Sequence, residues 1–433
     1  QLLGIRHNKT YRMSAGASGW KVAAVWLARV IAGAAFVVSG WAKSVDPRGF
    51  VYKLSEYLSV WHIDGIVNTD ILAIVAVALS VFEFVTGLMI ITGSLRRSSP
   101  IAGLLMMIVM LPLTAYIAIA DPVSDCGCFG DLIVLGNTET FLKNIVITAA
   151  LIIALIWHKA AMPLYRPGLQ WLVGVLGGIY AITVAVIGWQ FQPVVDFRPY
   201  SVGHTLVTEE TESAGPVYIY SKDGEESPFG LDELPDSTWT FVRAVDNHAG
   251  DNGIAVFDGD DDVTEALLAP DEAGSPMLLL VVTEPGVDNL VRSRLANELA
   301  EYAADNGIRM AGIVALSGDA LDQWIEMARP EFDVYSSSDT SLKQLVRGGQ
   351  GLVLLDGDRR VVWKRNFATI PPDILEREAP LQSVVSVDDG RVAIWLSICF
   401  VAGLILLYAI SALTRLNPRP KCKNKTYDKT STK

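Results

Sequence analysis

Six long apolar stretches stand out in the pattern of hydrophobic and polar positions along the chain. A membrane-spanning helix needs about 20 mostly apolar residues to cross roughly 30 Å of hydrocarbon. We therefore predict transmembrane helices over residues 21–42, 70–92, 101–120, 141–157, 169–189 and 392–414. The first stretch is too long for the core of a signal peptide and is followed by further spans, so we interpret it as an uncleaved anchor.

Between the last two spans the pattern changes to one typical of an α/β domain. Short runs predict small strands at 217–220 and 239–242, within a turn-rich segment, residues 192–273. From residue 274 to 375, buried strands alternate with amphipathic helices, which predicts a βαβ unit followed by a hairpin. The expected strands are 277–282, 310–316, 351–355 and 361–364, and the expected helices are 287–306 and 320–328.

The predicted fold is an α-helical membrane bundle of six spans, with an α/β domain inserted between the fifth span and the sixth. We expect a four-helix domain over residues 21–160 and a fifth span within 168–190. Residues 1–20 and 415–433 are the terminal segments. Met13 is a plausible translation start just before the first span, so residues 1–12 are candidates for a non-native extension.

The composition agrees with this division, because charge is unevenly distributed. The chain has 433 residues, 51% of them hydrophobic, and a net charge of −12 from 35 basic and 47 acidic residues. Residues 191–390 hold 37 acidic and 14 basic residues, a net charge of −23, which leaves +11 for the remainder. Phosphates would repel such an acidic block, so we expect no nucleic-acid partner.

Lysine and arginine in short loops indicate which side of the membrane each loop occupies, since basic loops stay in the cytoplasm. When six spans alternate, four basic segments fall on one side. They are the start of the chain, the loop with Arg96 and Arg97, the loop with Lys159 and Arg166, and the tail after Arg415. We therefore expect a multi-pass protein of the bacterial cytoplasmic (inner) membrane, with both termini in the cytoplasm and the acidic block in the periplasm.

Four cysteines are present, and only Cys126 and Cys128 are expected to lie close together. They stand just beyond the outer end of the third span, in the run Asp125-Cys126-Gly127-Cys128-Phe129-Gly130-Asp131, where an oxidising compartment permits a disulfide. Cys399, in the last span, and Cys422, in the tail, are expected to be inert.

The spacing of this pair favours redox chemistry over a structural staple. A Cys-x-Cys bridge closes a tight ring, and strain makes such a disulfide easier to reduce, whereas stabilisation by a structural disulfide grows with loop length. A structural bridge is the alternative. Metal binding ranks third, because no histidine is nearby and two thiolates leave a tetrahedral zinc site half empty, so we expect no metal.

The aspartates on either side of the pair have two interpretations. Asp125 and Asp131 would raise the pKa values of both thiols by like-charge repulsion, which disfavours the thiolate. Alternatively, they bind backbone amides where the chain approaches the fourth span.

Glu83 lies in the middle of the second span, where an ionisable side chain is costly and usually faces a partner inside the bundle. Lys43, at the outer end of the first span, is the candidate partner. Glu83 would exchange protons with the thiol chemistry, because disulfide steps take up or release protons. Equally, it would hydrogen-bond to a hydroxyl such as that of Ser39 or Thr114 and fix helix packing. The sequence leaves both hypotheses open.

The first four spans resemble the DoxX/MauE group of small four-helix membrane proteins, and its MauE-type branch in particular. The resemblance covers residues 20–160 and rests mainly on the Cys-Gly-Cys run. The other matching residues are Ser39, Gly40, Trp41, Ala42, Lys43, Asp46, Pro47, Phe50, Tyr57, Glu83, Gly87, Lys143 and Asn144. It implies a redox-associated membrane protein, since MauE is linked to methylamine utilisation and to the maturation of a disulfide-rich dehydrogenase subunit. The longer architecture is similar to that of DoxX-family proteins of Bacteroidetes.

Residues 274–375 resemble a thioredoxin fold without its catalytic signatures. Where that fold places Cys-x-x-Cys after its first strand, this chain has Thr283-Glu284-Pro285-Gly286, and where it places a cis-proline before its third strand, the chain reads Gly349-Gln350-Gly351. We expect this domain to be a non-redox adaptor or binding surface. The acidic cluster around Asp260 fails the EF-hand spacing, and no P-loop or dinucleotide fingerprint is present.

The sequence thus predicts thiol–disulfide redox chemistry or disulfide maturation at the outer membrane boundary, with Cys126 and Cys128 cycling and Glu83 exchanging protons. The supporting residues are Lys43, Asp46, Asp125 and Asp131. The expected partners are the lipid bilayer and a periplasmic thiol protein, and a quinone is the candidate cofactor. One alternative is a non-catalytic scaffold or assembly factor that binds a partner through the outer domain. Another is a subunit of a quinone-linked oxidoreductase.

A reporter fused after Lys159 tests this topology. We expect a fluorescent protein at this position to be bright and alkaline phosphatase to be inactive, because basic short loops stay in the cytoplasm. The matched fusion after Gly136, in the loop that follows the cysteines, should give the reverse pattern. An outer-side signal after Lys159 would contradict the placement of the cysteine pair.

Overall fold

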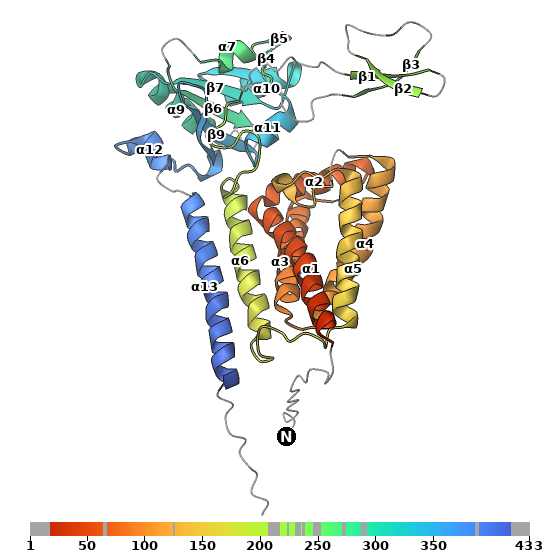
Figure 1. The fold of residues 1–433 in the computed structure, drawn as a ribbon. Coiled ribbons are helices and arrows are strands. Elements are labelled where there is room, and N and C mark those ends of the chain that lie inside the picture. Colours follow the sequence, from red (N-terminus) through yellow and green to blue (C-terminus); the bar gives the residue numbers. More distant parts are fainter. Residues whose placement is uncertain are drawn as a thin grey trace, which may run out of the picture. The chain divides into compact units, whose positions relative to one another are not determined.

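The protein divides into two compact units in the computed structural model. One unit comprises Gln1–Val186 with Asp389–Lys433, and the other comprises Ile187–Asp388. The structure describes residues 18–63, 67–123, 126–206, 217–222, 225–229, 235, 239–245, 253–270, 274–286, 292–385 and 389–416. The first unit is helical, and the second is built on β-sheets (Figure 1).

Six helices of the first unit are long and apolar enough to cross a membrane. They are α1 (Gly19–Val45), α3 (Thr69–Thr92), α4 (Ser98–Ala120), α5 (Asn137–Ile156), α6 (Gln170–Gln190) and α13 (Asp389–Leu416). Each one contains or closely overlaps a predicted span, so the expectation of six spans is confirmed. Many of their side chains are apolar and exposed, as lipid contact requires.

A short helix, α2 (Pro47–Val60), fills the connection between the first two spans. The sequence analysis treats this segment as a loop. The Asp46 side chain caps the helix by accepting a hydrogen bond from the Gly49 N–H at 2.9 Å, and Pro47 occupies the first helical turn. The Asp46-Pro47 pair in the sequence therefore marks the start of helix α2. Val51 and Tyr57 point from α2 into the protein.

Helices α1 and α3 pack with their backbones in close approach. A Cβ atom at Gly40 of α1 would collide with the backbone nitrogen of Phe84, and one at Gly87 of α3 would lie 2.6 Å from the backbone nitrogen of Val37. Small residues at such an interface let the backbones of two membrane helices approach closely, so that neighbouring side chains of the two helices pack against each other. These two glycines therefore set the register of α1 on α3.

The fifth and sixth spans join this bundle through a polar contact and an aromatic stack. The Tyr180 hydroxyl of α6 lies 2.9 Å from Ser397 Oγ of α13 and accepts a hydrogen bond from Trp41 Nε1 of α1 at 3.2 Å. The Tyr180 and Phe400 rings stack with their centroids 4.4 Å apart. At the other end of these helices, the Arg166 guanidinium donates to the Thr414 carbonyl at 2.6 Å. The two spans that flank the α/β unit in sequence thus pack on one another.

The larger sheet of the second unit has seven strands in the order β10-β9-β6-β7-β8-β4-β5. The strands are β4 (Phe257–Asp258), β5 (Asp261–Asp262), β6 (Met277–Val282), β7 (Arg309–Val314), β8 (Asp333–Ser336), β9 (Gln350–Leu355) and β10 (Val361–Asn366). Strand β6 is parallel to β7 and antiparallel to β9, and β9 and β10 form an antiparallel hairpin. The predicted βαβ unit and hairpin are confirmed, and their arrangement is that of a thioredoxin-like domain.

Helices cover both faces of this sheet because the β6 side chains alternate between two apolar cores. Leu278, Leu280 and Val282 pack beneath α9 (Ser293–Asp305) and α10 (Asp319–Ala328). Met277, Leu279 and Val281 pack against α7 (Thr264–Leu268) and α11 (Asp339–Leu345). The sequence analysis did not predict β8, α11 or the β4–β5 hairpin, since these elements are short and carry several polar residues.

A second sheet has three antiparallel strands in the order β2-β1-β3. They are β1 (Val217–Lys222), β2 (Glu225–Phe229) and β3 (Thr240–Val245). The structure confirms the predicted strands at 217–220 and 239–242 and adds β2. The remaining short elements are α12 (Pro380–Val385) and 3-10 turns at Gly130–Leu132, Phe367–Thr369 and Ile374–Glu376.

A buried charge cluster ties the start of the second unit to β10. The Asp196 carboxylate accepts hydrogen bonds from Arg198 Nε at 2.7 Å and from Arg198 Nη2 at 2.9 Å, and it lies 2.5 Å from Lys364 Nζ. Burial by itself would raise the pKa of Asp196, but the charges of Arg198 and Lys364 outweigh it and lower that pKa to about 2. Burial lowers the pKa of Lys364 to about 7, helped by the Arg198 charge and opposed by Asp196.

Replacing Asp196 should destabilise the second unit. We expect Asp196→Asn to cost about 3–5 kcal/mol, because it leaves the buried Arg198 cation without its partner and makes Lys364 either lose its proton or stay buried as an unpaired cation. Hydrogen–deuterium exchange of the β6 and β9 amides in the full chain measures this loss. Folding lowers the Asp196 pKa from 3.8 to about 2, so the carboxylate's contribution is present above about pH 4 and is lost as the pH falls toward 2.

The matched control is Asp339→Asn. Asp339 pairs with Lys343 on the exposed side of α11, so its loss should cost no more than about 0.5 kcal/mol. Equal effects of the two variants would show that the Asp196 cluster contributes no more than a surface pair.

Candidate functional site

The two neighbouring cysteines lie in the loop between α4 and α5. Cys126 is buried and Cys128 is half-buried, and their Sγ atoms are 2.7 Å apart as free thiols. Gly127, between them, has a φ of +64°, a left-handed conformation that other residues rarely adopt. The glycine therefore permits the turn that brings the two thiols to one side.

Helix α2 holds this loop from one side. The Tyr57 hydroxyl donates a hydrogen bond to the Cys126 carbonyl at 2.8 Å, and the Tyr57 ring packs with Ile117 and Val123. The aliphatic stem of Lys53 lies against Gly127, where an added Cβ would be 2.6 Å from Lys53 Cγ. The helix that the sequence analysis missed is thus the element that covers the cysteine loop.

The predicted partners Lys43 and Glu83 form a buried ion pair. Lys43 Nζ lies 2.7 Å from Glu83 Oε2, and the two side chains are 4% and 8% exposed. The Ser39 hydroxyl has one proton to donate and lies between two acceptors, Glu83 Oε1 at 2.8 Å and the carbonyl oxygen of Cys128. Ser39 thus links the intramembrane carboxylate to the cysteine loop.

The other residues considered from the sequence take separate places. Thr114 accepts a hydrogen bond from Asn144 at 3.2 Å and donates to the Met110 carbonyl at 2.8 Å, so Ser39 is the hydroxyl at Glu83. Asp46 caps α2. Asp131 is exposed in the 3-10 turn Gly130–Leu132, and Asp125 lies outside the described residues.

The two thiols have opposed acidities. A hydrogen bond from Cys128 is the main cause that lowers the pKa of Cys126 to about 7, and Tyr57 and the charges of Lys143 and Lys43 act in the same direction, against burial. The hydrogen bond to Cys126 and burial raise the pKa of Cys128 well above its usual value. The expectation that flanking aspartates raise both pKa values is wrong for Cys126, because the hydrogen bond from Cys128, helped by Tyr57 and by the charges of Lys143 and Lys43, outweighs burial. Near neutral pH the pair therefore holds a thiolate beside a thiol.

A small hollow of about 170 Å³ opens beside the pair. Its lining includes Phe129, Ile133, Leu135, Thr140 and Lys143. The Lys143 ammonium lies 4.1 Å from the centre of the Phe129 ring, a cation–π contact. Lys143 matched the family resemblance but was not predicted as a site residue. Its position near the start of the span that follows the cysteines was the available signal.

The thioredoxin-like domain holds no thiol at the two places where that fold carries its catalytic residues. Thr283 follows β6, and its hydroxyl donates to the Gly348 carbonyl at 2.6 Å. Gln350 starts β9 and pairs with Val282. A hydroxyl and an amide therefore stand where a redox thioredoxin has sulfur and proline. This accords with the predicted role as a binding surface.

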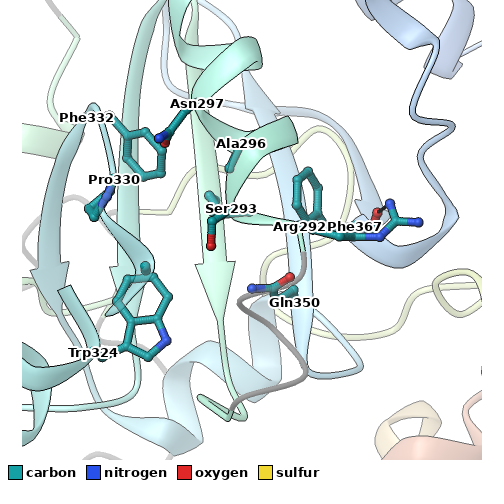
Figure 2. A pocket seen from close by; sticks show the side chains of 11 residues that line it. Arg292, Ser293, Ala296, Asn297, Trp324, Pro330, Phe332, Gln350 and Phe367 are labelled. Carbon is teal, nitrogen blue, oxygen red and sulfur yellow. Dashed lines mark hydrogen bonds between the residues drawn. The ribbon is translucent and has the colours of Figure 1, made fainter. Parts of the chain in front are cut away.

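A second depression of about 270 Å³ lies between α9 and α10 of this domain. Figure 2 shows Trp324, Phe332, Ser293 and Gln350 around it. The Trp324 indole is 5% exposed, and its Nε1 is buried without a hydrogen-bond partner among the described residues. The depression thus combines apolar walls with one unused donor.

The acidic cluster around Asp260 forms the exposed β4–β5 turn. Asp262 accepts a hydrogen bond from the Thr264 N–H at 2.9 Å where α7 begins, and the hydrogen bonds of the Thr264 side chain and then of this N–H lower the pKa of Asp262. Over the described ranges of the chain, no group of three or more His, Cys, Asp or Glu residues is arranged to hold a metal. This turn is therefore an exposed structural element of the sheet.

Comparison with known proteins places the cysteine loop in a described family. Residues 21–158, which contain α2 to α5 and most of α1, match the family described as methylamine utilisation protein MauE. Residues 216–248 match a domain of unknown function, DUF8463. No curated protein matches the chain at a significant level.

Among solved structures, a thioredoxin-like protein from Bacteroides caccae is similar at 9% identity, over 75% of this chain and 93% of its own, with a TM-score of 0.21. That score is too low to support an argument, so the thioredoxin-like assignment rests on strand order and direction. The predicted MauE resemblance is confirmed, and the wider DoxX resemblance stays a prediction. Residues 21–158 match the MauE family, so this membrane protein combines a MauE-like helical domain with a domain of thioredoxin-like strand order.

Proposed function

We propose that this protein exchanges thiols and disulfides with cysteine-containing proteins at the outer face of a bacterial cytoplasmic membrane. The observation that carries the proposal is the pair of adjacent thiols with opposed acidities beside a surface hollow. A thiolate at neutral pH is the attacking species in exchange, and a nearby thiol completes it. A role in disulfide maturation of periplasmic partners follows, and nothing in the site requires methylamine.

The exchange balances between the protein and its partner. The Cys126 thiolate attacks a partner disulfide, a Cys126–partner bond forms, and one partner sulfur leaves as a thiolate. Cys128 then loses its proton and attacks Cys126 Sγ, so the Cys126–Cys128 disulfide forms and the second partner sulfur leaves. Two electrons pass to the partner, and the reverse direction oxidises a partner dithiol. If the reverse direction is the physiological one, a membrane quinone is the class of acceptor that reoxidises the pair.

The size of the hollow favours a protein partner at this face. Pockets that hold small molecules bury most of the ligand's surface, whereas this hollow is a small, partly open depression whose volume of about 170 Å³ includes open solvent. A cysteine side chain on a partner needs less room than a quinone ring with its isoprenoid tail.

Glu83 is the proposed proton acceptor during this exchange. Cys128 must lose a proton, and Ser39, within hydrogen-bond distance of both Glu83 and the Cys128 carbonyl, holds the cysteine loop beside the carboxylate that would accept it. Lys43 keeps the carboxylate paired inside the bundle. The competing hypothesis is that the ion pair only fixes α1 on α3, and the two make different predictions for thiol turnover.

The alternative function is a scaffold that binds a partner through its outer domain, with the cysteines static. The depression at Trp324 supports this candidate, because it is a hollow of the outer domain with aromatic side chains, Trp324 and Phe332, in its lining. A subunit of a quinone-linked oxidoreductase remains a further candidate, by analogy alone.

Thiol trapping in native membranes separates cycling from static cysteines. We expect the pair to shift between oxidised and reduced forms when a reductant or a quinone is added, and we expect alkylation of reduced Cys126 to be half-maximal near pH 7. Mass spectrometry of the trapped peptides measures both. Cys399→Ser, in α13, is the control and should change neither result. A pair that stays oxidised under every donor would favour the scaffold.

Removing the intramembrane carboxylate tests the proton role. We expect Glu83→Gln to slow thiol exchange about 10²-fold, the usual contribution of a positioned acid or base, as measured by stopped-flow reaction with a disulfide peptide. Because this variant leaves Lys43 unpaired, Lys43→Gln/Glu83→Gln removes both charges and should be equally slow. Glu56→Gln, on exposed α2, is the control. A folded double variant with normal exchange would leave the pair a packing role only.

A further inference from the structure

Apolar side chains form part of the lining of the hollow beside the cysteines, and the rim of the hollow is exposed. Ile133 is 46% exposed and Val134 is 72% exposed, and Ile133 has an extended backbone, with φ −143° and ψ 106°. Ile133 and Leu135 line the hollow together with the Phe129 ring. An extended peptide laid along this rim would cover apolar surface that is otherwise exposed.

One cation of this wall, Lys143, forms no ion pair among the residues that the structure describes. Lys43 is paired with Glu83, and Lys53 is paired with Glu56. Lys143 contacts the Phe129 ring and forms no ion pair with a carboxylate in the parts of the chain that the structure describes. Its charge also acts on both cysteines. A cation in the wall of a reactive site selects anionic partners by charge complementarity.

We propose that this wall selects the protein partner, by pairing Lys143 with a carboxylate next to the partner's reacting cysteine and by covering Ile133 and Leu135 with an apolar side chain. This inference rests on the proposed function, because it names the substrate class of the same thiol pair. The occupant is an extended cysteine-containing segment with an acidic residue beside the cysteine. Lys143 is a positioning residue and takes no part in the exchange of bonds.

An anionic lipid headgroup is the other chemistry that Lys143 would attract. The protein segment is favoured because Lys143 lines the same hollow as both cysteines. A headgroup at this position would block the thiols rather than serve them.

The experiment compares three peptides that differ only beside an activated cysteine, which carries a thionitrobenzoate group. One has Asp next to the cysteine, one Gln and one Lys. The reduced full-length protein in phosphatidylcholine nanodiscs releases the coloured thiolate, and its appearance gives the exchange rate. Because Lys143 also affects the thiolate fraction, the ratio of the Asp-peptide rate to the Lys-peptide rate is compared, since that fraction cancels in the ratio.

We expect the wild-type protein to react about fivefold faster with the Asp peptide than with the Lys peptide, the effect of one partly exposed ion pair. Lys143→Gln should bring the ratio close to one, and Lys143→Glu should invert it. The control is Arg48→Glu on α2, which makes the same change in net charge outside the lining of the hollow and should keep the wild-type ratio.

The contrary results distinguish the failure of recognition by Lys143 from the failure of the proposed exchange. Equal rates for the three peptides in wild type, or a ratio unchanged in Lys143→Glu, would overturn the recognition by Lys143 and leave the proposed exchange intact. A ratio that falls to one in phosphatidylglycerol nanodiscs would assign Lys143 to a lipid headgroup and would likewise overturn the recognition of an acidic partner by Lys143. Failure of every peptide and of a small disulfide such as dithiodipyridine would instead refute the proposed exchange itself.

Discussion

The buried ion pair between Lys43 of α1 and Glu83 of α3 is the constraint on which the membrane domain depends. Desolvating two charges is expensive, and their attraction offsets the cost only when geometry and additional hydrogen bonds are good. Both conditions are met: Nζ and Oε2 are 2.7 Å apart, and Ser39 satisfies the second carboxylate oxygen. The close approach at Gly40 and Gly87 makes this geometry available. Helix packing and buried charge therefore support each other.

Ser39 extends this constraint to the chemistry. Its hydroxyl lies within hydrogen-bond distance of both Glu83 and the Cys128 carbonyl, while Tyr57 of α2 binds the Cys126 carbonyl. The loop is thus held by the bundle through Ser39 and by α2 through Tyr57. The remaining side of the loop borders the hollow that Lys143 helps to line. A rigid backbone around two adjacent thiols maintains their opposed acidities, because those depend on a short contact between the sulfur atoms.

The α/β unit uses buried charge differently. Asp196 compensates Arg198 and Lys364 at the start of the domain, so the segment that follows the fifth span is anchored on β10. The domain keeps the strand order of a thioredoxin-like fold, with Thr283 and Gln350 at the places of its catalytic residues. In the scaffold hypothesis, the depression at Trp324 is the surface through which this domain contacts a partner. In the exchange hypothesis, Cys126 and Cys128 carry out the reaction and the domain has only a supporting role.

The sequence by itself determined the six spans, the βαβ-hairpin order, the cysteine pair and Glu83, because apolar length, periodicity and rare intramembrane charge are local signals. It missed α2, β8 and α11, which are short and depend on packing for their stability, although Asp46-Pro47 marked the start of α2. One of the two hypotheses that the sequence left open for Asp125 and Asp131, a raised pKa of Cys126, has the wrong direction, since it weighed neighbours in sequence. Only the tertiary structure placed Tyr57, Lys43 and Lys143 around the thiols, because electrostatic and hydrogen-bond effects depend on distance in space.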